Sequence, residues 1–261
     1  MSAVRTLRVD GVTVRFGGVV ALDDLSFEAR PAEVLGIIGP NGAGKTTLFN
    51  VISGVQRPTA GIVALDEIVL TNLPIHRIAA LGVTRTFQTP VMFWGLTVRE
   101  SIMVALAARA QRVEHTLISA GLGFARGGGG LDEQLAQADA LLVGTPLEPH
   151  ADLATESPSF GQARMLEIVR ALAIEPSVLL LDEPLSGLNP DEIRHVLALV
   201  RGLREHGVTV LFVEHDLANL LTAADRFVVL DHGRKITEGS PEAVCADPIV
   251  LEAYIGDEVS A

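Results

Sequence analysis

The chain has 261 residues, of which 48% are hydrophobic and 20% are charged, a balance typical of a globular protein with one large domain or a core and a subdomain. Its net charge of −12 argues against a broad non-specific nucleic-acid surface, because phosphate backbones are bound by clustered Lys and Arg. No apolar run approaches the ~18 residues of a membrane span, and the N-terminus does not resemble a signal peptide, so we expect a soluble, cytoplasmic chain. The single cysteine, Cys245, predicts that there is no internal disulfide.

The first thirty residues predict antiparallel strands. Short apolar stretches with alternating polarity occupy residues 7–9, 12–14 and 25–27. They are separated by Asp10-Gly11 and Gly17-Gly18, pairs that are typical of tight turns. We therefore expect an N-terminal antiparallel β subdomain.

Residues 39–47 fill the G-x-x-x-x-G-K-[ST] template of a phosphate-binding loop. The run 34–38 predicts a buried strand before the loop and 48–52 a helix after it, which is the context that the motif requires. Glycines let successive N–H groups point at phosphate oxygens, and the helix N-terminus adds positive potential. The Lys45 ammonium suits the β and γ phosphates and the Thr46 hydroxyl suits Mg²⁺. The predicted phosphate-binding residues are Gly39, Pro40, Asn41, Gly42, Ala43, Gly44, Lys45, Thr46 and Thr47.

After further strands at 63–65 and 82–87, the pattern becomes helical. Thr97 and Glu100 have the spacing of a capping box, which predicts a helix from there to about residue 110. A second helix is expected over 131–143, after a glycine-rich loop, and a third from about Ala163 to Ala173. Residues 97–170 therefore predict an all-helical insertion subdomain.

The C-terminal half alternates strands with a helix. Strands are expected at 178–181, 208–213 and 227–230, and a helix at 189–205 with Pro190 in its first turn. This alternation predicts an α/β fold with a mostly parallel sheet flanked by helices. We expect a nucleotide-binding core of residues 4–96 and 171–240, and a helical tail over 241–261.

Acidic and polar side chains follow the expected strands. Asp182 and Glu183 end an apolar strand, where ligands of open α/β sheets lie. We expect Asp182 to hold Mg²⁺ through water and Glu183 to orient or deprotonate an attacking water. His215 lies past another strand and can donate a hydrogen bond to a γ phosphate, and the Gln88 amide can bind Mg²⁺ or position water.

The segment 157–164 predicts a second anion site at a helix start. Ser159 offers a hydroxyl and Gly161 a backbone N–H there. One chain with two phosphate-binding sites suggests a two-fold pairing in which each chain's second site closes over the nucleotide of the other.

Together these residues resemble the ATP-binding subunits of ABC transporters. Residues 39–47 look like the Walker A motif, 178–183 like Walker B and 186–190 like the D-loop. Gln88 matches the Q-loop glutamine and His215 the switch histidine. The resemblance runs from about residue 7 to 256 and implies a P-loop NTPase core, ATP and Mg²⁺ as ligands, and ATP hydrolysis in a head-to-tail dimer.

Two positions depart from the family pattern. The signature motif, usually LSGGQ, has Pro158 for Leu and Phe160 for the first Gly, whereas Ser159, Gly161 and Gln162 match. The residue expected to stack on adenine is a phenylalanine, Phe16, instead of the usual tyrosine, and a phenyl ring can still stack. The resemblance implies that Ser159, Phe160, Gly161 and Gln162 contact the nucleotide of the partner subunit.

The variant motifs are similar to those of branched-chain amino acid importer ATPases, a subgroup whose relatives serve urea and amides. The similarity lies in residues 85–88, 187–190 and 247–256. It implies uptake of a small polar solute, a second ATPase subunit (a copy or a paralogue), two membrane permease subunits, a solute-binding protein and a position on the inner face of the membrane. We expect coupling to the permease between residue 88 and about residue 109.

Two other functions use the same loop. A soluble ABC ATPase of repair or translation usually carries coiled-coil insertions or tandem cassettes, and the sequence has neither. A GTPase or adenylate-type kinase has no use for Gly161-Gln162 or for His215, and no Asn-Lys-x-Asp sequence is present. The transported substrate is not specified by this chain, and the direction of transport follows only from the resemblance.

Overall fold

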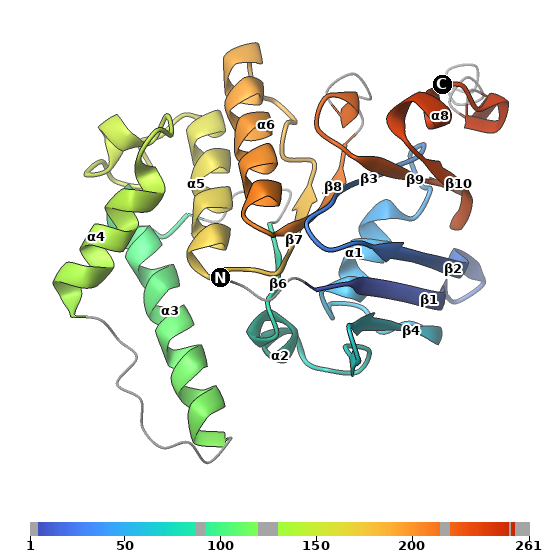
Figure 1. Cartoon of the computed structure of the whole chain (residues 1–261), viewed down its shortest axis with the longest axis horizontal. Coiled ribbons are helices and arrows are strands. Elements are labelled where there is room, and N and C mark those ends of the chain that lie inside the picture. The colour runs from blue at the N-terminus through green and yellow to red at the C-terminus, as the bar shows by residue number, and fades with distance from the viewer. Residues whose placement is uncertain (1–4, 87–91, 120–129, 215–219, 251, 254–261) are drawn as a thin grey trace. The chain divides into compact units, whose positions relative to one another are not determined.

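The computed structural model describes residues 5–86, 92–119, 130–214, 220–250 and 252–253 (Figure 1). The chain forms two compact units. The first comprises the residues up to Arg85, Ser177–Ser186 and the residues from Leu197 on, and the second comprises Thr86–Pro176 and Gly187–Val196. We call them the nucleotide-binding unit and the helical unit. The predicted division at residues 97–170, and the tail at 241–261, stay predictions.

An antiparallel sheet contains the N-terminal strands of the nucleotide-binding unit, as predicted. Its strand order is β2-β1-β4-β5. The strands are β1 (Leu7–Phe16), β2 (Val19–Ala29), β4 (Ala60–Leu65) and β5 (Ile68–Val69). The hairpin between β1 and β2 turns at Gly17 and Gly18, because Phe16 pairs with Val19.

The turn predicted at Asp10-Gly11 is wrong, since one continuous strand, β1, passes through these residues. The register with β2 shifts between Val9 and Val12, so the extra residue forms a bulge. Gly11 takes a φ of 59° there, and a Cβ on Gly61 of β4 would lie 2.2 Å from its carbonyl oxygen. Asp10-Gly11 thus marks a bulge instead of a turn, and the positive φ of Gly11 suits either structure.

The second sheet of this unit is mostly parallel, in agreement with the predicted fold class. Its order is β10-β9-β3-β8-β7-β6, and only the β9–β10 pair is antiparallel. The strands are β3 (Val34–Ile38), β6 (Val83–Arg85), β7 (Val178–Asp182), β8 (Thr209–Val213), β9 (Arg226–Asp231) and β10 (Arg234–Gly239). Strands β3, β7 and β8 are buried at every residue, which is why they read as unbroken apolar runs.

Helix α1 (Lys45–Ile52) packs in the core between the two sheets. Its apolar residues join a cluster with side chains from β1, β2, β3, β7 and β8. The unit also holds α2 (Ile75–Ala80) and α8 (Pro241–Cys245). The core therefore fixes the helix that follows the phosphate loop directly against both sheets.

The helical unit contains α3 (Val98–Ser119), α4 (Leu131–Leu142), the 3-10 turn η1 (Glu148–His150) and α5 (Phe160–Ala173), and α6 (Pro190–Glu205) begins in it. The predicted capping box is confirmed, because the Glu100 backbone N–H donates to the Thr97 hydroxyl and the Thr97 N–H to the Glu100 carboxylate. Helix α3 runs well beyond residue 110, and α5 begins three residues before Ala163. The predicted loop at 121–130 lies outside the described residues except for Gly130.

None of the helices in the described ranges is both long enough and apolar enough to cross a lipid bilayer.

Packing between β3 and β9 predicts a glycine requirement at position 36. A Cβ on Gly36 would lie 2.2 Å from the fully buried ring of Phe227. We expect Gly36→Ala to lower the free energy of unfolding by about 1–3 kcal/mol, the usual cost of overpacking. The measurement is urea denaturation followed by circular dichroism.

The matched control is Gly202→Ala in helix α6, where an added methyl meets no atom within 4 Å. This change should raise the free energy of unfolding by roughly 0.5–1 kcal/mol, because alanine restricts the unfolded chain. A Gly36→Ala chain as stable as the wild type would contradict the packing described here.

Candidate nucleotide-binding site

The phosphate loop joins β3 to α1 in the nucleotide-binding unit. Three of its residues have positive φ: Gly39 at 151°, Gly42 at 82° and Gly44 at 101°. Gly44 is the N-cap of α1, so the backbone turns directly into the helix and leaves its first N–H groups facing the loop. This geometry forms a concave group of donors, which is what an anionic phosphate requires.

Neighbouring strands enforce two of the glycines. A Cβ on Gly39 would lie 2.1 Å from the carbonyl oxygen of Leu230 in β9, and one on Gly44 would lie 2.6 Å from that of Ala21 in β2. An added Cβ on Gly42 would meet nothing within 4 Å. The loop is thus held against strands at both ends and is open at its centre, where a ligand can approach the backbone.

Lys45 places a positive charge within the loop. Its residue is only 6% exposed, and its ammonium donates to the carbonyl oxygens of Gly39 at 2.6 Å and Pro40 at 2.9 Å. An ammonium is a compact charge whose three N–H donors rotate about one bond, so it suits a backbone cradle better than a planar guanidinium does. Only one other lysine, Lys235, exists in the whole chain.

Thr46 and Asp182 carry oxygen atoms that could hold a cation. The Thr46 side chain is exposed at the start of α1, and Asp182 ends β7 with only 4% of its surface exposed. The donor set fits Mg²⁺, which prefers a few hydroxyl and carboxylate oxygens together with phosphate and water. Among the residues that the structure describes, no group of three or more His, Cys, Asp or Glu side chains forms a complete metal cage.

Glu183 follows Asp182 in a strained backbone conformation. Its φ is +49°, which is uncommon for a residue other than glycine, and its N–H donates to the carbonyl of Val213 at the end of β8. Such strain concentrates at functional sites and persists only when the surroundings hold it. Nothing in the sequence signals this conformation.

Glu214 is a buried carboxylate that sequence reasoning missed. It is 4% exposed and accepts a 2.6 Å hydrogen bond from the backbone N–H of Leu185. It therefore ties the end of β8 to the turn that follows Glu183. A charged residue at the end of an apolar strand, directly before His215, was the available signal.

Three further residues are predicted to belong to the site. Phe16 is half exposed at the tip of the β1–β2 hairpin, and β2 reaches the loop at Ala21 a few residues later. Gln88 and His215 lie outside the described residues, so their roles remain predictions.

The signature motif lies in the helical unit, at the start of α5. Ser159 is its N-cap: the hydroxyl accepts from the N–H of Gln162, and the Gln162 side chain accepts from the N–H of Ser159. This capping box explains why the helix begins at Phe160 and not near Ala163. It also fixes the position of the helix N-terminus, where the partial positive charge of the helix lies.

Gly187 of the D-loop and Glu192 of α6 lie against this motif. A Cβ on Gly161 would lie 2.2 Å from the carboxylate of Glu192, and one on Gly187 would lie 3.2 Å from the Phe160 ring. Glu192 also accepts from the backbone N–H of Asn189 at 2.9 Å, which caps α6. Glycine is therefore needed at position 161 for packing within the chain. The absence of a side chain would also let a phosphate approach the backbone closely. Sequence reasoning missed Glu192.

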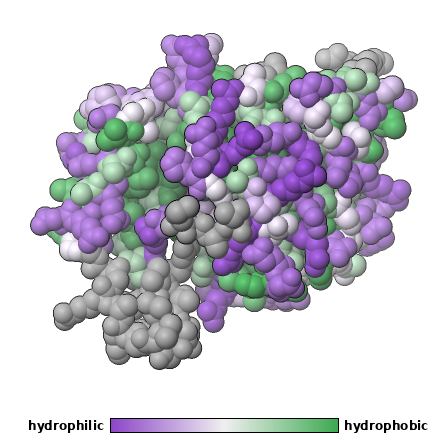
Figure 2. Space-filling model, in the orientation of Figure 1, coloured by the Kyte–Doolittle hydropathy of each residue, from purple (hydrophilic) through white to green (hydrophobic). Residues whose placement is uncertain are grey.

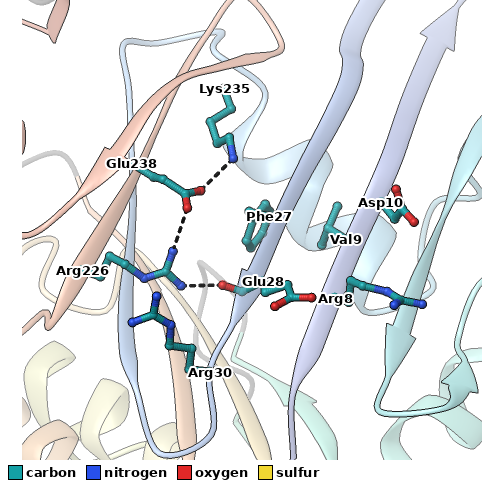
Figure 3. A pocket seen from close by; sticks show the side chains of 9 residues that line it. All are labelled: Arg8, Val9, Asp10, Phe27, Glu28, Arg30, Arg226, Lys235 and Glu238. Atoms are coloured by element: carbon teal, nitrogen blue, oxygen red, sulfur yellow. Dashed lines mark hydrogen bonds and ion pairs between the residues drawn. The ribbon is translucent and has the colours of Figure 1, made fainter.

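Another charged cavity, of about 350 Å³, lies between β1, β2, β9 and β10 of the nucleotide-binding unit (Figure 3). Arg226 dominates it, with bonds to Glu33 at 2.7 Å, to the Glu28 carbonyl and to Glu238. The hydrogen bonds with Glu33 raise the pKa of Arg226 above its usual value. Arg226 begins β9 and pairs with Leu35 in β3, so the cavity lies at the end of these strands away from the phosphate loop. The guanidinium of Arg226 is already paired with Glu33.

Family models match two parts of the chain. Residues 22–186 match the model described as ABC transporter, and residues 234–260 match the model described as branched-chain amino acid ATP-binding cassette transporter.

Individual proteins match nearly the whole chain. It is 39% identical over 256 residues to the high-affinity branched-chain amino acid transport ATP-binding protein BraF of Pseudomonas aeruginosa, and 38% identical over 252 residues to the corresponding LivG of Salmonella typhimurium. Each match covers 96% of this chain and 98% of the relative.

Solved structures share the fold. The ADP conformation of an ATP-binding cassette of an ABC transporter has a TM-score of 0.81 and 32% identity, and the match covers 97% of this chain and 99% of that one. A dimeric ATP-binding cassette in a post-hydrolysis state with ADP and Pi has a TM-score of 0.76 and 25% identity, with 90% and 98% covered.

The contact of Gly161 with Glu192 generates a prediction. We expect Gly161→Ala to destabilise the chain by about 1–3 kcal/mol, because its methyl overlaps the Glu192 carboxylate. Urea denaturation of the two single variants and of the Gly161→Ala/Glu192→Ala double variant forms a double-mutant cycle. Truncating Glu192 should recover part of the loss, with a coupling of at least ~0.5 kcal/mol. Strictly additive effects would show that the carboxylate is not the obstacle.

Proposed function

The chain belongs to the ABC transporter family, as its motifs predicted, and on this premise we propose that it drives the uptake of a small polar solute by binding and hydrolysing ATP. Branched-chain amino acids are the substrates that we assign to the transporter. The family is one of ATPases, and the phosphate loop between β3 and α1 is the observation that carries the assignment.

The triphosphate of ATP is proposed to lie in the concave loop 39–47. The loop amides and the N-terminus of α1 would bind the phosphate oxygens, and Lys45 would neutralise the β and γ phosphates. Phe16 would stack on the adenine. Phosphoryl transfer then depends on positioning and charge, which a rigid backbone loop supplies.

Mg²⁺ is proposed to bind between Thr46 and Asp182, with Gln88 as a further ligand. When bound, the ion would withdraw negative charge from the phosphates. Glu183 is proposed to act as general base on the attacking water, and His215 to donate a hydrogen bond to the γ phosphate. The fixed, strained backbone at Glu183 supports a positioned catalytic side chain.

The signature motif has its use in a head-to-tail pair. We propose that Ser159, Phe160, Gly161 and Gln162 of one subunit close over the ATP of the other, with a second copy or a paralogue as partner. The exposed, capped N-terminus of α5 and the half-exposed Phe160 support this reading. The likeness to a dimeric cassette holding ADP and Pi supports the pairing.

Two permease subunits and a solute-binding protein are the further proposed partners, with the chain on the inner face of the membrane and no nucleic-acid partner. Trp94, in the segment expected to couple to the permease, is 80% exposed. Figure 2 shows apolar side chains on the helical unit near α4 and α5. A cavity of about 420 Å³ there is lined partly by Leu106, Leu141 and Leu172, as a protein partner's surface would be.

Reconstitution tests this function. The chain is co-expressed with its neighbouring permease genes, and proteoliposomes are assayed with the solute-binding protein for ATP-driven uptake of leucine, isoleucine, valine, urea and acetamide. Uptake of the three branched-chain amino acids supports the assignment. Uptake of urea or acetamide alone would replace the substrate, and copurification with ribosomes or DNA instead of membrane subunits would replace the transport function.

A first prediction concerns Glu183. The Glu183→Gln chain should bind ATP normally but turn over ~10²-fold more slowly or worse, the size of a general-base effect. Steady-state phosphate release and equilibrium ATP binding check the two halves of the prediction. Glu67→Gln, at an exposed turn of the same unit, is the control. Near-normal turnover by Glu183→Gln would remove Glu183 from the role.

A second prediction separates the two lysines. Lys45→Ala should weaken ATP binding roughly tenfold or more, because hydrogen bonds to charged groups contribute about 1.5–3 kcal/mol. Lys235→Ala removes a lysine that pairs with Glu238 on β10 and should bind ATP like the wild type. Isothermal titration calorimetry measures both, and unchanged affinity in Lys45→Ala would contradict the proposed phosphate contact.

A further inference from the structure

Arg85, the last residue of β6, joins three elements of the nucleotide-binding unit. Its guanidinium donates to Asp182 Oδ2 at 2.7 Å, to Asn50 Oδ1 at 2.6 Å and to the Ser53 hydroxyl at 3.3 Å. It also lies 5.7 Å from the centre of the Phe49 ring. One side chain thus connects β6 to the end of β7 and to the helix that follows the phosphate loop.

The pair between Arg85 and Asp182 is buried. The two side chains are 8% and 5% exposed. Buried carboxylates stay charged only when a partner compensates the loss of water, and a guanidinium provides a charge that is fixed at all physiological pH values. Arg85 therefore compensates the Asp182 carboxylate for the water that it loses on burial.

The geometry also orients the carboxylate. Arg85 engages Oδ2, and within the described part of the chain no hydrogen bond reaches Oδ1. Asn50 and Ser53 hold the other end of the guanidinium, so it cannot swing away with Asp182. One oxygen of Asp182 is thereby committed to the protein, and the other is left for a ligand.

We propose that Arg85 is a positioning residue for the metal that accompanies ATP: it fixes the Asp182 carboxylate through Oδ2 and leaves Oδ1 for the cation. This inference rests on the magnesium site proposed above. Partners that orient a metal-binding carboxylate typically contribute roughly 10–100-fold to metal affinity or activity. Arg85 also lies three residues before Gln88, another proposed metal ligand. Its bond to Asp182 therefore anchors the strand that leads to Gln88.

A purely structural role is the alternative, and the chain offers a matched control for it. Arg226, at the start of β9 (Figure 3), and Glu33, just before β3, form a second buried pair, with side chains 11% and 7% exposed. Loss of either arginine should destabilise the fold. Only the loss of Arg85 should change how the metal acts on nucleotide binding.

The experiment measures AMP-PNP affinity of the full chain in EDTA and over a series of free Mg²⁺ concentrations. The ratio of the two affinities is the gain due to the metal. In Arg85→Met we expect affinity in EDTA to stay as in the wild type and the gain to fall roughly tenfold or more. Arg85→Lys keeps the positive charge but lacks the planar guanidinium that bonds to several partners at once. It should recover part of the gain in affinity from Mg²⁺. Arg226→Met should keep the full gain while lowering the melting temperature.

A wild-type gain in Arg85→Met, with only a lowered melting temperature, would overturn the proposal and leave a structural pair. If Arg85→Met does not fold, Arg85→Lys and Asn50→Ala decide the matter, because each loosens the guanidinium and should reduce the gain in the same direction. Unchanged gain in both would overturn it too. A wild-type chain without any gain from Mg²⁺ would overturn the magnesium site itself, a result that is distinguishable from failure of Arg85 alone.

Discussion

The close packing of the phosphate loop against two strands is the constraint on which the rest of the site depends. Gly39 lies against β9 and Gly44 against β2, and neither place has room for a Cβ. Gly39, Gly42 and Gly44 take positive φ values, and the loop that they shape presents its amides to a ligand. An anion site built from main-chain donors needs little reorganisation when the ligand binds, and this is the form of stabilisation that phosphoryl transfer uses.

Charged side chains are fixed around this loop by burial and pairing. Lys45 bonds to loop carbonyls, Arg85 to Asp182, and Glu214 to the backbone after Glu183. Removing one partner of a buried ion pair such as Arg85–Asp182 typically costs about 3–5 kcal/mol. In the helical unit, the start of α5 is likewise fixed by the capping box at Ser159 and by the contact of Gly161 with Glu192.

The sequence predicted the fold class and most strands, because fully buried strands such as β3, β7 and β8 read as unbroken apolar runs. It failed where local signals are ambiguous: Asp10-Gly11 permits a bulge as well as a turn, and only pairing with β2 decides. Phosphate-loop residues were predictable because the motif is contiguous. Arg85 and Glu192 were not, because their partners Asp182 and Gly161 are distant along the chain and only the folded structure brings them together.

Hydrogen exchange of the Glu183→Gln chain with Mg²⁺ and ATP tests the central claim most directly, since exchange reports on each stretch of backbone separately. We expect the amides of residues 39–47 to gain protection whenever ATP is bound, and those of Phe160 and Gly161, which take no part in the capping box, to gain it only at protein concentrations at which two chains pair. Saturating ATP that leaves residues 39–47 exchanging as in the free chain would contradict the account.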